Sequence, residues 1–135
     1  MKKLILVITM TLLFTAITNG QSLAYKLATI ESVEMDYPAF SGKSLYDLED
    51  DFSSLLLRLD QYYTISKGRI GDYTAHTQGK LKNYGIKASM LKIMKTAMIV
   101  EYNKINYEIF CAYYYTLRKR GFTSNQIAFK INMQL

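Results

Sequence analysis

This 135-residue protein has one histidine, His76, and one cysteine, Cys111. These two side chains are its strongest candidates for a catalytic base, a nucleophile or a metal ligand. Nucleophilic catalysis needs a serine or cysteine held beside a base, and only His76 could be that base. The residues around Ser53, Ser54 and Cys111 contain no elbow-like turn that would present a nucleophile. The sequence therefore predicts that the protein is not an enzyme.

Paired carboxylates could still serve a small enzyme that acts on cell-wall material, as they do in glycosidases. The acidic side chains gather instead at the start of one predicted helix, in the run from Asp47 to Asp51. Acidic side chains at that place complement the positive end of the helix dipole, which accounts for them without catalysis. A small cell-wall enzyme is kept as an alternative.

Metal and nucleotide sites are poorly supported. Asp72 and His76 stand four residues apart, but zinc usually takes three or four protein ligands. The segment from Ser41 to Ser44 matches the end of a phosphate-binding loop, but the glycine required five residues before Gly42 is replaced by Tyr37. We expect no metal and no cofactor.

A third pattern concerns nucleic acid. The segment from Arg118 to Ala128 resembles the first half of a DNA-binding helix-turn-helix. A recognition helix should follow it, but the sequence ends at Leu135. We expect no binding to nucleic acid.

Tyrosine is the most unusual component of the sequence, with twelve tyrosines and no tryptophan. Three of them are consecutive, Tyr113 to Tyr115, and on a helix they point in directions about 100° apart. They either bridge core and surface or form a contact surface for a protein partner, because tyrosine is enriched at interfaces. The predicted binding surface on this segment includes nearby cations and consists of Tyr107, Tyr113, Tyr114, Tyr115, Lys104, Arg118 and Lys119.

Residues 66–85 are rich in glycine and polar side chains, which predicts a long loop with one helical turn near its end. Long loops inside compact domains often carry function. Asp72, Tyr73 and His76 are therefore added to the predicted binding surface.

The first twenty residues have the layout of a secretory signal peptide. A basic start, Met1 to Lys3, precedes an apolar run from Leu4 to Ile17, which is shorter than the ~20 residues that span a bilayer. Small and polar residues follow up to Gly20. We expect residues 1–20 to be removed and residues 21–135 to form a single domain. The mature protein is expected to be periplasmic or secreted. An uncleaved membrane anchor is the alternative.

Charge is unevenly distributed along the remaining chain. Residues 21–60 hold eight acidic and three basic side chains, whereas residues 61–135 hold three acidic and twelve basic ones. The two halves could neutralise each other by packing together, or the basic half could face a polyanion or an anionic membrane surface.

The sequence, half of it hydrophobic, predicts an all-α fold: an up-and-down bundle of four or five helices with one long central helix. Apolar spacing predicts helices over 22–35 and 45–65, the second capped by Ser44 and Asp47. Residues 86–119 contain no proline or glycine and predict the long helix, with a break near Asn103 to Asn106 left open. Cys111 is expected to be buried there, an intermolecular disulfide being the alternative. Thr123 and Gln126 predict the cap of a last helix.

These patterns together predict an exported, non-catalytic helical protein that binds another protein of the cell envelope or an exported partner. It would be a component of a secretion or envelope assembly, or an inhibitor or immunity-type protein. A binder of anionic lipid or envelope polymer through the basic half is the first alternative, so a membrane surface stays a candidate partner. The oligomeric state is left open.

Overall fold

The computed structural model describes residues 22–35 and 44–134, and this part of the chain is entirely helical. The predicted signal peptide lies outside the described residues. The described helices are α2 (Leu23–Met35), α4 (Leu45–Tyr63), α5 (Lys67–Asn83), α6 (Met90–Ile99), α7 (Tyr107–Lys119) and α8 (Ser124–Gln134).

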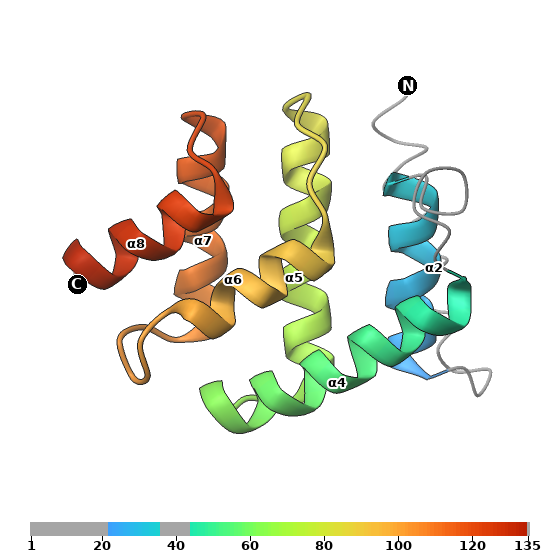
Figure 1. Ribbon diagram of the computed structural model, residues 1–135. Coiled ribbons are helices and arrows are strands. Elements are labelled where there is room, and N and C mark those ends of the chain that lie inside the picture. Colours follow the sequence, from blue (N-terminus) through green and yellow to red (C-terminus); the bar gives the residue numbers. More distant parts are fainter. Residues whose placement is uncertain (1–21, 36–43, 135) are drawn as a thin grey trace.

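The helices form two layers (Figure 1). One layer holds α2, α5 and α7, and the other holds α4, α6 and α8, with α5 and α6 in the middle of their layers. Within each layer the helices run in the same direction, so the described chain is a stack of three helix pairs: α2 with α4, α5 with α6, and α7 with α8. The all-α class is confirmed. The predicted four or five helices are not, because the described residues alone form six.

Local capping signals placed two helices accurately. Ser44 accepts a hydrogen bond from the backbone N–H of Asp47, and the Asp47 carboxylate accepts one from the N–H of Ser44. Thr123 and Gln126 make the same reciprocal pair at the start of α8. Gly121 adopts a φ of 93°, which favours glycine and lets the chain turn sharply between α7 and α8.

The predicted loop over residues 66–85 is wrong, because this segment forms α5. Ser66 caps the helix by accepting a hydrogen bond from Arg69, and Ile70, Ala75 and Leu81 are buried along one side. The glycine at position 71 serves close packing: a Cβ there would lie 3.1 Å from Leu23 Cδ1 of α2. Tertiary contact thus outweighs the low helix propensity of glycine.

The long helix predicted over residues 86–119 divides into α6 and α7, and the break that the sequence left open near Asn103 to Asn106 lies between Val100 and Asn106. The chain leaves helical geometry at Val100, which is extended, and Asn106 caps α7 by accepting from the N–H of Ile109. Tyrosines at the end of α4 donate hydrogen bonds to carbonyl groups at the end of α6, which have no helical partner there. The Tyr62 hydroxyl donates to the Val100 carbonyl at 2.5 Å, and the Tyr63 hydroxyl donates to the carbonyl of Ala97.

A buried carboxylate ties α2 to α5 and to the start of α6. Glu31 is fully buried, and its two oxygens accept hydrogen bonds from Ser89 Oγ (2.8 Å), the N–H groups of Met90 (3.0 Å) and Leu91 (2.9 Å), and Gln78 Nε2 (3.0 Å). Glu31 therefore caps the N-terminus of α6 from a distant helix, and the positive end of the α6 dipole favours its charge. Burial raises the pKa of the Glu31 carboxyl, while these four hydrogen bonds act to lower it.

Candidate interaction surface

The structure separates the predicted tyrosines into two groups. Tyr107 and Tyr114 are buried, and their hydroxyls bond to Thr74 Oγ1 (2.6 Å) and Ser124 Oγ (2.8 Å). Neither ring can be offered to a partner, so their assignment to a contact surface is corrected: both belong to the core. Tyr113 is 37% exposed, and Tyr115 is half-buried against lysine side chains.

The structure disperses the other predicted residues. Lys104 lies between α6 and α7 and pairs with Glu101 at 3.3 Å. Arg118 lies in the last turn of α7 and donates to the carbonyl of Phe122 at 3.0 Å. Asp72 and His76 are exposed on α5, where they were expected on a loop, and Tyr73 is half-buried there.

Basic and aromatic side chains gather instead where α5 and α7 end and α8 begins. The helices α2, α5 and α7 run in the same direction, so their C-termini reach one side of the molecule (Figure 1). We call this surface the basic aromatic edge; its members are Lys80, Lys82, Tyr84, Tyr115, Lys119, Arg120, Phe122 and Lys130.

Cations on this edge rest on aromatic rings. Lys119 Nζ lies 4.4 Å from the ring centroid of Tyr84 and 4.8 Å from that of Tyr115. Lys80 Nζ lies 4.3 Å from the Tyr115 centroid. Farther along, Lys130 Nζ and Arg120 lie 4.5 and 5.6 Å from the Phe122 centroid. Such contacts hold long side chains in place while their charges stay near solvent.

The edge is electropositive. Within residues 22–35 and 44–134, Lys80, Lys119, Arg120 and Lys130 make cation–π contacts and no ion pair with a carboxylate. Lys82 differs, because it pairs with Glu34 at 2.8 Å. Part of this positive charge balances the negative ends of the α5 and α7 dipoles. The last turn of each helix holds two basic side chains, which is more positive charge than one helix dipole requires.

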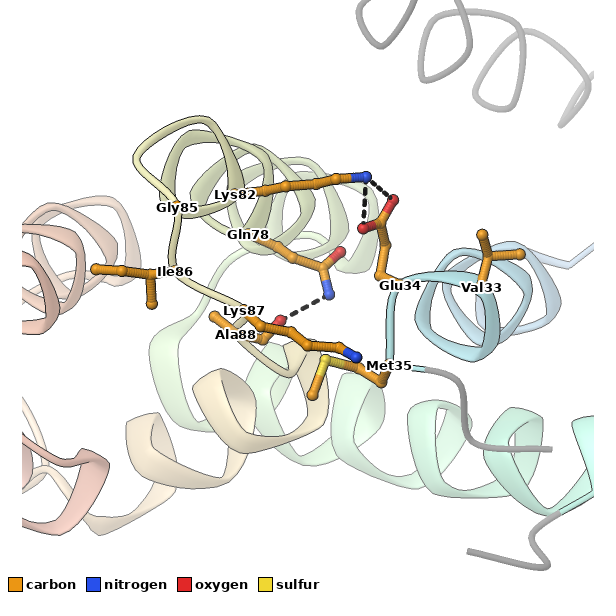
Figure 2. A pocket seen from close by; sticks show the side chains of 9 residues that line it. All are labelled: Val33, Glu34, Met35, Gln78, Lys82, Gly85, Ile86, Lys87 and Ala88. Atoms are coloured by element: carbon orange, nitrogen blue, oxygen red, sulfur yellow. Dashed lines mark hydrogen bonds and ion pairs between the residues drawn. The ribbon is translucent and has the colours of Figure 1, made fainter. Parts of the chain in front are cut away.

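A pocket of about 390 Å³ lies beside the edge, between the ends of α2 and α5 and the connection to α6 (Figure 2). Val33, Met35 and Ile86 give it apolar walls, and Lys82 and Glu34 pair across its rim. Gln78 forms part of its wall and donates to the Ala88 carbonyl at 2.8 Å. Lys87 also lines the pocket, so its apolar walls are bordered by one acidic and two basic side chains.

A second hollow of about 340 Å³ lies between α5 and α7 and brings Tyr73 and His76 together with Lys80, Glu108 and Cys111. The thiol is not set up as a nucleophile. Burial raises the pKa of Cys111 to about 12, although hydrogen bonds with Thr77 and Tyr107 act to lower it. The thiol is therefore protonated at neutral pH, and its predicted burial is confirmed at 5% exposure.

Chemical labelling tests this description of Cys111. We expect iodoacetamide at pH 8 to modify the native protein on the order of 10³-fold more slowly than the urea-unfolded chain, because only the thiolate reacts. Mass spectrometry of timed samples measures both rates. Equal rates would show that the thiol is exposed, and a disulfide-linked dimer on a non-reducing gel would support the intermolecular alternative.

In the described part of the chain, no three histidine, cysteine or acidic side chains lie close enough together to hold a metal ion. Among the same residues, no helix has both the length and the apolar character needed to cross a membrane.

Sequence reasoning found Tyr115 and Lys119 of the edge, and Arg118 beside it, but missed the six other members. Lys80, Lys82 and Tyr84 were assigned to a loop, so their alignment with the end of α7 was not visible. The available signal was the presence of basic residues before two helix ends, at 80–82 and 118–120.

Comparisons of the chain with protein-family models, with curated proteins and with solved structures find no match, so the case for a function rests on the geometry of the edge and of the pocket beside it.

Proposed function

We propose that the protein is an exported, non-catalytic binding protein whose basic aromatic edge recognises an acidic surface of another protein. One observation carries the proposal: Lys80, Lys119, Arg120 and Lys130 are held against aromatic rings instead of against carboxylates. Their charges are positioned in advance, so a partner that supplies carboxylates would order few side chains on binding.

The pocket favours a protein partner over a membrane. A hollow of about 390 Å³ with apolar walls, bordered by Lys82 and Lys87, fits an apolar side chain flanked by acidic ones. Lipid headgroups would meet the cations but leave the pocket without a matching group. Aromatic residues such as Tyr84, which is 61% exposed, supply the rigid contact area typical of protein interfaces.

Binding of anionic lipid or envelope polymer is the second candidate, because the same cations would attract a polyanion. It differs in its dependence on salt: exposed charge contacts are screened over ~8 Å at physiological ionic strength, and a polyanion offers little besides charge. Retention on a protein partner should weaken less with salt, since the rings and the pocket also contribute.

Export is the part of the proposal that rests on the sequence alone. The basic start, the apolar run of residues 4–17 and the small residues up to Gly20 support it. A periplasmic or secreted location would bring the edge into contact with envelope or exported proteins.

The binding proposal is tested with the double variant K119Q/R120Q, which removes two positive charges from the edge. Its affinity for the partner recovered from the envelope fraction is compared with that of wild type. We expect affinity to fall about tenfold, which corresponds to ~1.4 kcal/mol. The matched control is K67Q/R69Q, which also removes one lysine and one arginine, both exposed at the opposite end of α5. Calorimetry should give the control an affinity within twofold of wild type. Equal losses in both variants would indicate a response to net charge and contradict the assignment.

A further inference from the structure

The outward face of the α4, α6 and α8 layer exposes large apolar side chains that the basic aromatic edge does not use. On α4 these are Tyr46 and Leu57, on α6 Ile99, and on α8 Phe129 and Met133, with exposures from 49% to 74%. Each lies on the opposite side of its helix from the buried residues, as the 3.6-residue period requires. Isolated apolar residues on a surface are ordinary, so their grouping needs separate evidence.

The apolar residues of α6 and α8 adjoin one another. Asn132 donates to the Ile99 carbonyl at 3.2 Å and accepts from the N–H of Glu101 at 2.8 Å, which fastens the end of α8 to the end of α6. Met133 follows Asn132 directly, and Phe129 lies one turn earlier on the same side of α8. Phe129 also lines a hollow of about 440 Å³ with Phe122. Exposed apolar side chains therefore lie along α8 and at the adjoining end of α6, and we call Ile99, Phe129 and Met133 the apolar strip.

Charge divides the same layer into an acidic and a basic half. The sequence of α4 holds five acidic side chains and one arginine, and Asp50 is exposed beside Tyr46 and Leu57 on the outward face. Helices α6 and α8 contain no acidic side chains and instead hold Lys92, Lys95 and Lys130. Because α6 lies between α4 and α8, the acidic helix α4 is on one side of the layer and the exposed apolar residues of α8 are on the other.

We infer that this face binds a second copy of the chain, with α4 of each protomer lying against the apolar strip of its partner. In a two-fold dimer both contacts form at once, because the same patch is self-complementary. Tyr46 and Leu57 then cover Ile99, Phe129 and Met133 of the other protomer, and acidic side chains of α4 meet lysines. The outward stripe from Tyr46 to Leu57 is ~16 Å long at 1.5 Å per residue, and the two-fold axis doubles this contact.

This inference goes beyond the proposed function and uses a surface that meets the basic aromatic edge only at Phe122 and Lys130, which line the same hollow as Phe129. The layer of α2, α5 and α7 supplies Lys80, Tyr84, Tyr115 and Lys119, so dimerisation through the other layer leaves these residues accessible. Loss of dimer and loss of partner binding are therefore separable by variant.

Sedimentation velocity over a range of protein concentrations tests the inference on protein produced from the full chain. We expect a concentration-dependent dimer in wild type and at least a tenfold rise in the dimer dissociation constant in F129D/M133D. Both side chains are exposed, at 65% and 70%, so the variant should retain its helical circular dichroism. The matched control is V33D, which places an aspartate at a 68% exposed apolar residue of α2 in the other layer. The control should dimerise as wild type does.

A charge exchange gives the more demanding test. D50K on α4 and K95E on α6 should each weaken the dimer about tenfold, and the double variant D50K/K95E should recover most of the loss. Recovery supports contact between the acidic helix and the basic half. A monomer at every soluble concentration, a dimer unaffected by F129D/M133D, or single exchanges without recovery in the double variant would each overturn the inference.

Discussion

Replacing Glu31 with leucine is expected to cost at least about 3 kcal/mol of unfolding free energy and roughly 10 °C in Tm. The carboxylate is fully buried and accepts four hydrogen bonds. Leucine fills similar space but leaves the Ser89 hydroxyl and the N–H groups of Met90 and Leu91 without this acceptor. Urea unfolding followed by circular dichroism gives the free energy.

The control for this variant is E34Q, one turn later on the same helix. Glu34 pairs with Lys82, whose side chain is 44% exposed, so the change should cost less than about 1 kcal/mol. Equal effects of E31L and E34Q would contradict the role of Glu31 as the remote cap of α6.

Replacing Tyr114 with alanine is expected to destabilise the protein by about 3–5 kcal/mol, as truncation of large aromatic core residues does. The ring is 1% exposed, packs 5.9 Å from the Phe110 ring between centroids, and its hydroxyl bonds to Ser124. The change would therefore open a cavity between α7 and α8 and leave the Ser124 hydroxyl without this partner. Thermal and urea unfolding measure the loss.

The neighbouring residue supplies a control of identical chemistry. Tyr113 is 37% exposed on the same helix, so Y113A should cost no more than about 1 kcal/mol. A reversed order, with Y113A the more damaging, would mean that α7 is turned differently about its axis.

The helices with local signals were predictable from sequence. The reciprocal caps at Ser44 with Asp47 and at Thr123 with Gln126 involve residues three apart, so the chain specifies them without any distant contact. The same holds for the glycine turn at Gly121. These signals gave the starts of α4 and α8 and the end of α7.

The remaining errors come from contacts between distant residues. Four glycines between 66 and 85 favoured a loop, but Gly71 allows α5 to approach Leu23 closely, a reason that exists only in the folded protein. The break within residues 86–119, which the sequence left open, also depends on distant residues. Carbonyl groups at the end of α6 are satisfied by Tyr62 and Tyr63, which lie more than thirty residues earlier in the chain.

The candidate site was predictable only in part, for a related reason. Composition identified tyrosine and basic residues as the unusual feature, and Tyr115 and Lys119 do lie on the edge. Burial could not be assigned within the run of tyrosines until the neighbours of α7 were known. Lys80 and Tyr84 join the site through packing of α5 on α7, which no spacing along one helix reveals.

The most direct test of the central claim places a photoactivatable cross-linking amino acid at Tyr84 on the edge, and separately at Tyr46 on α4, in the full chain expressed in its source cell. The proposal predicts that position 84 yields an adduct with one acidic protein from the envelope fraction, and that K119Q/R120Q strongly reduces it. Position 46 should yield at most an adduct between two copies of this chain. Adducts from position 84 with lipid or polymer only, or the same partner captured from position 46 and not from 84, would contradict the claim.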